Sequence, residues 1–546
     1  MSRRARPPLR RHRRRVLTRT LGRVVEPWWK SAVVYQIYPR SFADTNGDGV
    51  GDLNGITEHL DHIERLGVDA MWISPFFTSP MKDYGYDVAD YTGVDPLFGT
   101  LEDFDRLIDE AHRRHLRVLI DWVPNHTSDQ HPWFQESRQS RTNDKADWYV
   151  WKDADPTDPA KPPTNWRCAF TDGPAWEWVE ERQQWYLHLF LPEQPDLNWR
   201  NPQVRGAMHD TLRFWLDRGV DGFRIDVVHG LMKDPSWPDL PDEPENRRRY
   251  GPMIYDVDAT IDLVRDFRHV LEEYAGDRVM VGEVYILSTA QVARYYGDGD
   301  ALHMAFNFPP LYAPWEAAAW RKRVDRVVDE FDPRNAWPTW VLSNHDNPRH
   351  RTRYGGREDR ARAAALLLLT LRGTPFVYAG EELGLEDAIV PAHRVLDPGG
   401  RDGCRAPIPW TPRADHGWGQ PDNWLPWPPN AETANAATQA SDASSMLALY
   451  RRILAARQAS PALQLGDWRA IDAPAGVLAY ERHHAPTGDR RVVLVNFSDD
   501  MVRLPLDVAG AYVVEVATDD RTSGSYDGTV QPSQALMLRP APATVA

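Results

Sequence analysis

Acidic, imidazole and guanidinium side chains stand at the carboxyl ends of several short apolar runs in this chain. A single acid in such a position is more often the N-cap of the following helix than a catalytic group. Polar groups that recur at the ends of several buried runs are harder to explain as structure alone, and they favour one shared catalytic rim. The residues concerned are Asp121, Asn125, His126, Arg224, Asp226, Glu283, His345 and Asp346.

Paired carboxylates suit the cleavage of a glycosidic bond. The reaction passes through an oxocarbenium-like transition state, and it needs one ionised acid beside the anomeric carbon and one protonated acid beside the leaving oxygen. Arg224 precedes Asp226 by two residues, so on a strand both side chains point the same way. We expect the guanidinium to keep Asp226 ionised and to fix its rotamer. Glu283 follows the apolar run VMVG, where a less polar setting would raise its pKa and suit it to general acid catalysis.

These side chains need strands that end on one common face. Eight short β-like runs alternate along the chain with amphipathic segments such as 101–115 and 203–219. Strands that alternate with helices predict parallel βαβ units, and eight such units predict an α/β fold of the (β/α)8 TIM-barrel type. The runs are VVYQIY from Val33, AMWIS from Ala70, RVLIDWV from Arg117, GFRID from Gly222, VMVGEVY from Val279, MAFNF from Met304, TWVLSNHD from Thr339 and PFVYAGEE from Pro375.

The chain is longer than a barrel requires, so further regions are expected around it. We assign the barrel to residues 27–125 and 200–459. The Pro- and Trp-rich region 126–199 separates the third strand from the fourth and predicts an insertion domain. Alternating runs between turn residues predict a C-terminal antiparallel β-sandwich over 460–546. Residues 1–26 are expected to be a disordered basic extension, because the first twenty positions hold nine Arg and no acid.

The composition argues against several classes of protein. A net charge of −15 argues against a nucleic-acid partner, which needs a basic face. No apolar run approaches the ~20 residues that cross a bilayer, and no signal-peptide apolar segment follows the basic start. Two cysteines, Cys168 and Cys404, are too few for a disulfide framework and favour the cytoplasm. The 23 tryptophans suit contacts with sugar rings, and a monomer and a homodimer are both compatible with the sequence.

The segment DTNGDGVGD carries oxygen side chains at alternate positions. Asp44, Asn46, Asp48 and Asp52 supply them, and the Val50 carbonyl is available between the last two. Hard oxygen ligands at this spacing suit calcium or magnesium. The segment lacks the glutamate that closes an EF-hand loop, so a metal-binding turn of another kind is expected.

Four segments resemble the signature regions of the α-amylase family of glycoside hydrolases. They are DWVPNH (121–126), GFRIDVVH (222–229), GEVY (282–285) and SNHD (343–346). QPDLN (194–198) is similar to a fifth region in the form found in the oligo-1,6-glucosidase and α-glucosidase subgroup. The resemblance extends over nearly all of the chain beyond about Trp28, with the segments in the same order.

The resemblance implies a role for each residue of the rim. It implies Asp226 as the nucleophile, Glu283 as the acid/base and Asp346 as a third acid that grips sugar hydroxyls. Asp121 would be structural beneath them, and the structural metal would be calcium remote from catalysis, with no organic cofactor. The residues implied to line the sugar subsite are His126, Arg224 and His345. Asp83 and Tyr86 of the segment DYGYD would close the end of the subsite around the terminal glucose. In the segment GRDGCRAPIPW, we expect Arg405, in preference to Arg401, to contact that glucose.

Several activities remain open within this resemblance. An exo-acting retaining α-glucosidase on small maltose-like α-glucosides comes first, because VVHGLMKDP and HMAFNFPPLYAPW resemble the bacterial α-glucosidases. Val227, directly after the implied nucleophile, favours the α-1,6 linkage and hence an oligo-1,6-glucosidase. Transglucosylating, sucrose-acting and trehalose-forming relatives share the same covalent intermediate. A non-catalytic barrel partner protein is disfavoured, because such relatives need a membrane segment, which this sequence lacks, and commonly lack the three acids, which it has.

Overall fold

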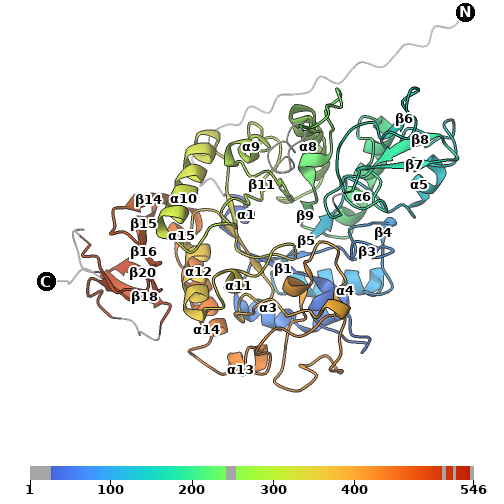
Figure 1. Ribbon diagram of the computed structural model, residues 1–546. Helices are drawn as coiled ribbons and strands as arrows, with labels where there is room; N and C mark the ends of the chain where they lie inside the picture. The colour runs from blue at the N-terminus through green and yellow to red at the C-terminus, as the bar shows by residue number, and fades with distance from the viewer. Residues whose placement is uncertain (1–25, 172, 242–253, 507–511, 520–523, 542–546) are drawn as a thin grey trace, which may run out of the picture.

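Eight parallel strands form the centre of the computed structural model, which describes residues 26–171, 173–241, 254–506, 512–519 and 524–541 (Figure 1). The order in the sheet is β11-β10-β9-β5-β2-β1-β13-β12, which confirms the predicted barrel and all eight predicted runs. Across the seam, Thr339 Oγ1 donates a hydrogen bond of 2.8 Å to the carbonyl oxygen of Ala305. The strands are β1 (Val34–Ile37), β2 (Ala70–Ile73), β5 (Arg117–Trp122), β9 (Gly222–Ile225), β10 (Val279–Gly282), β11 (Met304–Ala305), β12 (Thr339–Val341) and β13 (Thr374–Tyr378).

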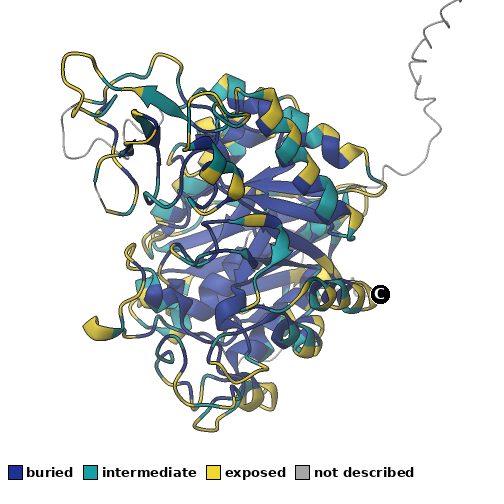
Figure 2. Cartoon of the chain, turned by 90° about the vertical axis from the view of Figure 1, so that its right-hand side faces the viewer, coloured by how far each residue is buried: buried dark blue, intermediate teal, exposed yellow. Residues whose placement is uncertain are grey.

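The helices cover the outside of the barrel, with their outward faces exposed and the strands buried (Figure 2). Helix α4 shows why these segments fold as they do. Thr100 and Asp103 form a capping box at its start, and Phe104, Leu107 and Ala111 are buried at helical spacing. The helices are α1 (Trp28–Ser31), α2 (Leu53–Glu58), α3 (Leu60–Leu66), α4 (Leu101–Arg113), α5 (Pro132–Ser137), α6 (Pro202–Asp217), α8 (Val257–Glu272), α9 (Thr289–Arg294), α10 (Ala317–Phe331), α11 (His350–Arg353), α12 (Glu358–Thr370), α13 (Ala436–Ala440), α14 (Met446–Gln458) and α15 (Pro461–Leu465).

The region between β5 and β9 carries a small sheet of its own. Its order is β6-β8-β7, with β6 (Trp151–Asp153), β7 (Trp176–Val179) and β8 (Gln184–Leu187) antiparallel. Arg182 lies over the ring of Trp151 at 4.1 Å, which is one way in which the many tryptophans of this region are used. A short hairpin of β3 (Phe77–Thr78) and β4 (Asp90–Val94) lies next to it (Figure 1).

The C-terminal region forms a five-stranded antiparallel sheet and a two-stranded ribbon. Alternate residues of its central strands face opposite ways. Leu478 and Tyr480 pack with the barrel helices, whereas Leu494 and Leu536 form a second core inside this region. Both faces of the central strands are therefore buried. The strands are β14 (Asp467–Ile471), β15 (Val477–His484), β16 (Asp489–Asn496), β17 (Val502–Arg503), β18 (Tyr512–Ala517), β19 (Thr529–Val530) and β20 (Ala535–Pro540).

Three further expectations from the sequence concern the basic extension, membrane-spanning segments and the two cysteines. The predicted basic extension lies, apart from Glu26, outside the described residues. Within the described parts of the chain, no helix has both the length and the apolar character needed to cross a membrane. Cys168 and Cys404 are both buried and unpaired.

Candidate active site

Arg224 lies at the centre of the predicted rim. Parallel pairing aligns it with Asp121 on β5 and with Val281 on β10, so the acids that end three neighbouring strands approach the same point. Its Nη1 is 2.7 Å from Asp121 Oδ1 and 2.5 Å from Asp226 Oδ1, and its Nη2 is 2.9 Å from Glu283 Oε2. Arg224 is 2% exposed, so these charges interact without much screening by water.

One guanidinium is shared by three carboxylates, and burial shifts the pKa of two of them. Burial raises the pKa of Asp226 well above its usual range; Glu283 and Asp121 add to this shift and Arg224 opposes it. Burial likewise raises the pKa of Asp121 to about 6. Arg224 contacts Asp226 as predicted, and its attraction opposes the rise in the pKa of Asp226 that burial causes.

The backbone turns sharply directly after Asp226. Val227 has a φ of +43°, in the left-handed region that a β-branched residue rarely adopts. This conformation directs the Val227 amide N–H to Glu283 Oε2, 3.0 Å away. The strained residue thus links the two predicted catalytic carboxylates through a backbone hydrogen bond.

A chain of hydrogen bonds runs through His345 behind the acids. Gln36 Nε2 lies 2.7 Å from His345 Nδ1, His345 Nε2 lies 2.6 Å from the Tyr86 hydroxyl, and that hydroxyl lies 3.1 Å from Asp121 Oδ2. Burial lowers the pKa of His345 to about 3, so its ring is neutral. With Gln36 donating to Nδ1, the ring hydrogen lies on Nε2. One face of the Tyr86 ring, which the resemblance implies closes the terminal glucose, is stacked on His345 with ring centroids 5.4 Å apart.

Two arginines hold the third predicted acid. Arg401 Nη1 and Arg405 Nη2 each lie 3.1 Å from Asp346 Oδ1. Burial alone would raise the pKa of Asp346, but His345, Arg401 and Arg405 outweigh it and lower the pKa below its usual range. Arg401 also reaches Asp83 at 2.7 Å, whereas Arg405 is completely buried and donates to the His345 carbonyl oxygen. Of the two, Arg401 is better placed to contact a sugar, which reverses the preference drawn from the sequence.

The region 126–199 supplies the other wall of the site. Gln194 Nε2 lies 3.0 Å from Asp83 Oδ2 and 3.0 Å from His126 Nε2, so it joins two of the predicted subsite residues. The ring of His126 contacts Phe190, and Phe170 lies under the guanidinium of Arg401 at 4.5 Å. The sequence motif around Gln194 pointed to this wall, but nothing local marked the two phenylalanines.

Exposed aromatic residues border the site on the side of Glu283. Tyr285 is 42% exposed and Tyr312 is 41% exposed, and their hydroxyl groups are hydrogen-bonded to each other. Tyr312 also donates to Asn347 Oδ1 at 2.8 Å, next to Asp346. Tyr285 ends the segment GEVY and Tyr312 lies within HMAFNFPPLYAPW, but neither segment indicated that the two hydroxyl groups meet.

The predicted metal loop is an oxygen-rich turn at the surface. Asp44 Oδ1 accepts the N–H of Asn46 at 3.0 Å, Asn46 Oδ1 accepts that of Asp48 at 2.9 Å, and Asp48 Oδ1 accepts that of Val50 at 2.8 Å. Asp52 instead caps α2 through Gly55. Among the described residues, no three His, Cys, Asp or Glu side chains converge on a possible metal position. The side-chain oxygens of the turn thus accept backbone N–H groups of the same turn, and its hard oxygen atoms are of the type that calcium and magnesium bind.

Comparison with known proteins places this site in a family. Residues 36–466 match the model described as the alpha amylase catalytic domain. A probable alpha-glucosidase of Rhizobium meliloti is 44% identical over 520 residues, covering 89% of this chain and 92% of that relative. An oligo-1,6-glucosidase of Parageobacillus thermoglucosidasius is 35% identical, covering 88% of this chain and 92% of that relative. The crystal structure of the alpha-glucosyl transfer enzyme XgtA is 41% identical, with a TM-score of 0.86 over 95% of this chain and 100% of that one.

A barrel with acids gathered at the carboxyl ends of its strands defines a broad class of barrel enzymes. The match to the catalytic domain and the identities to the relatives narrow that class. The chain belongs to the α-amylase family.

Proposed function

We propose that this protein is an exo-acting retaining α-glucosidase that releases glucose from the non-reducing end of short α-glucosides. The observation that carries the proposal is the convergence of Asp226 and Glu283 on the terminal nitrogens of Arg224, at 2.5 and 2.9 Å. Carboxylates that lie side by side suit retention, because an inverting enzyme keeps a wider gap for a water molecule. The names of the relatives support the same substrate class.

The proposed reaction has two steps, and in each step one covalent bond to the anomeric carbon breaks while another forms. Asp226 attacks the anomeric carbon while Glu283 gives its proton to the leaving oxygen, so that the glycosidic bond breaks and a glucosyl ester forms. Glu283 then takes a proton from water, and the hydroxide oxygen displaces Asp226. The positive charge that develops on the sugar favours the ionised form of Asp226, which opposes the effect of burial on its pKa.

Closure of one end of the site explains the proposed exo action. Arg401 connects Asp83 to Asp346, and Gln194 connects Asp83 to His126. These groups offer both donors and acceptors to the hydroxyls of a single terminal sugar. A longer chain would extend past Tyr285 and Tyr312 on the opposite side.

A substitution and a product analysis test this function. Asp226→Asn keeps the shape of the side chain but removes the nucleophile, so we expect cleavage of p-nitrophenyl α-glucoside to fall by about 10³-fold or more. Full activity in that variant would contradict the assignment of Asp226.

Oligo-1,6-glucosidase activity is the second candidate, favoured by Val227 next to the proposed nucleophile and by a relative of that name. Products from maltose, isomaltose, sucrose and trehalose separate the two. An enzyme that hydrolyses maltose but not isomaltose would show that Val227 does not indicate a preference for the α-1,6 linkage. Glucosyl transfer to a second sugar, or conversion of maltose to trehalose, would replace hydrolysis as the main reaction.

We also propose a structural Ca²⁺ in the turn formed by Asp44, Asn46, Asp48 and Val50, with Asp52 fixing the turn to α2 and Mg²⁺ as the alternative ion. The support is the alternate spacing of oxygens and the exposure of the turn. The ion would stabilise the loop and take no part in the reaction.

The remaining proposals concern the partner, the oligomeric state and the compartment. The proposed partner is a small sugar, and the proposed oligomeric state is a monomer or a homodimer. The proposed compartment is the cytoplasm, which the two unpaired buried cysteines support.

A further inference from the structure

The turn that follows β9 contacts the segment that carries Glu283. This turn contains the buried 3-10 helix η2 (Val228–Gly230), in which His229 is 6% exposed. His229 Nδ1 lies 3.1 Å from the Glu283 carbonyl oxygen and 3.2 Å from the Tyr285 backbone nitrogen. A single side chain of the turn therefore reaches the main chain on both sides of Val284.

Either neutral form of the His229 ring holds this main chain. With the ring hydrogen on Nε2, Nδ1 accepts the N–H of Tyr285, and with the hydrogen on Nδ1 the ring donates to the Glu283 carbonyl oxygen. Burial lowers the pKa of His229, so the ring is neutral at neutral pH. The ring of Tyr255 stands perpendicular to it, with centroids 5.2 Å apart, and this contact fixes the orientation of the ring.

The segment after β10 depends on such outside contacts, because it has no regular secondary structure of its own. Residues 283–288 belong to neither a helix nor a strand, and α9 begins directly after them. The Glu283 N–H still donates to the Ile225 carbonyl oxygen at 2.8 Å, as in the sheet. Two residues later, the Tyr285 N–H donates to the side chain of His229 instead. The neighbouring turn thus takes over where the sheet ends.

Close packing keeps the turn and the segment together. A Cβ atom at Gly282 would lie 2.9 Å from Val228 Cγ1, so a larger residue there would push the turn away from the strand end. At the start of the same turn, the Val227 N–H donates to Glu283 Oε2 at 3.0 Å. Glu283 is therefore held at its carboxylate by Val227 and along its main chain by His229.

We propose that His229 is a positioning residue that sets the orientation of Glu283, and the proposal rests on the acid/base role given to Glu283 under the proposed function. Glu283 must place its proton on the leaving oxygen while Asp226 attacks the anomeric carbon. Without the His229 contact, the main chain at 283–285 is free to rotate, and the carboxyl group leaves that line. A misplacement of about 1 Å can cost about 10²-fold in the rate of such a step.

The test compares two substrates of the full-length chain that differ in their need for this proton. A disaccharide, maltose or isomaltose as the wild type prefers, needs a proton on its leaving sugar, whereas fluoride leaves α-glucosyl fluoride without a full proton from Glu283. The ratio kcat/KM covers only the steps up to the departure of the leaving group. His229→Phe keeps a ring and removes the nitrogens. We expect it to lower kcat/KM about 10- to 100-fold for the disaccharide and less than about threefold for the fluoride.

Two further variants separate positioning from a general effect on the fold. His229→Asn places an amide donor and acceptor close to the position of Nδ1, so it should restore kcat/KM for the disaccharide to within about threefold of the wild type. His303→Phe is the matched control. His303 is also buried, and its Nδ1 accepts the N–H of Met280 at 3.2 Å, near the start of the same strand β10. It should lower the thermal midpoint and change kcat/KM for both substrates in the same proportion.

Equal losses on the two substrates in His229→Phe, or no loss on the disaccharide, would overturn the inference. A His229→Asn chain as impaired on the disaccharide as His229→Phe would overturn it as well. If His229→Phe does not fold, His229→Ala removes the same contacts and is compared with His229→Asn in its place. A wild-type chain that cleaves neither substrate would contradict the proposed function and the inference with it, whereas equal losses in an active chain overturn the inference alone.

Discussion

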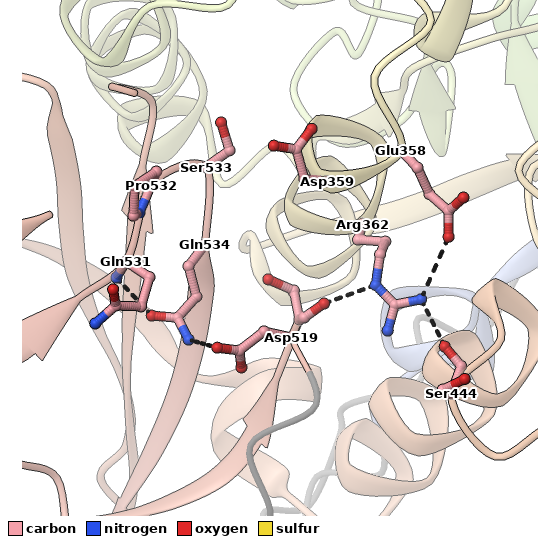
Figure 3. A pocket seen from close by; sticks show the side chains of 10 residues that line it. Glu358, Asp359, Arg362, Ser444, Asp519, Gln531, Pro532, Ser533 and Gln534 are labelled. Carbon is pink, nitrogen blue, oxygen red and sulfur yellow. Dashed lines mark hydrogen bonds and ion pairs between the residues drawn. The ribbon is translucent and has the colours of Figure 1, made fainter. Parts of the chain in front are cut away.

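Two regions of this molecule gather acids around an arginine, and they use it differently. At the carboxyl end of the barrel, Arg224 contacts three carboxylates from three strands. At the junction of α12 with the C-terminal region, Arg362 lines a cavity of about 380 Å³ together with Glu358, Asp359 and Asp519 (Figure 3). Its Nε donates to the Thr518 carbonyl oxygen at 2.6 Å and its Nη1 to the Ser444 carbonyl oxygen at 2.9 Å.

The two regions differ in how their acidic side chains are paired. In the cavity of Figure 3, Asp359 pairs with Arg357, Asp519 accepts from Gln534, and Glu358 is 3.8 Å from Arg362. The three acids there contact three different partners, whereas the three acids of the barrel contact one arginine in common. Competition leaves excess negative charge at a single point, which suits the stabilisation of a cationic transition state. Composition alone does not distinguish the two regions, but convergence does.

The largest expected effect comes from removing the shared guanidinium. Arg224→Met should lower kcat/KM by about 10³-fold or more, because three carboxylates lose their common positive charge. Steady-state kinetics on p-nitrophenyl α-glucoside measures this loss. Arg224→Lys is the control: it keeps the charge but not the planar fork, so we expect partial activity. A wild-type value of kcat/KM in Arg224→Met would show that the shared arginine is not needed for catalysis, and the two regions would no longer differ in this respect.

A smaller and different effect is expected at the domain junction. Arg362→Met leaves the Thr518 and Ser444 carbonyl oxygens without their donor, at a cost of about 1–3 kcal/mol in the free energy of unfolding. Urea unfolding measures that loss, and kcat/KM in the absence of denaturant should stay within about twofold of the wild type. A large fall in kcat/KM with unchanged stability would mean that the cavity takes part in catalysis.

The smallest expected effect concerns the turn 44–52. Excess EDTA should lower the thermal midpoint by a few degrees, since an ion that binds the folded state stabilises it by mass action. Added calcium should restore the midpoint, and Asp48→Ala should show no response to either reagent. Equal midpoints of the wild-type chain with and without calcium would contradict the metal proposal.

The sequence was sufficient to predict the barrel and its acids, because both signals are local. Each strand is a short apolar run, and the acids lie at its carboxyl end or just after it, as Asp121 and Glu283 do. The parallel sheet then brings the strand ends to one face as a matter of geometry. The strained turn at Val227 was not predictable, because nothing in a β-branched residue indicates a positive φ.

The features that the sequence could not give depend on contacts between distant segments. The competition for Arg224 follows from the register of β5, β9 and β10, which residue spacing does not specify. The choice between Arg401 and Arg405 depends on the path of a long loop after β13.

The most direct test of the central claim is to trap the intermediate. Incubation with 5-fluoro-α-glucosyl fluoride should leave a glycosyl group on the enzyme, because the ring fluorine slows both oxocarbenium-like steps while the good leaving group keeps the first one fast. Peptide mass spectrometry should then find one added sugar on the peptide that contains Asp226. A label on a peptide without Asp226, or turnover with no label at all, would contradict the account.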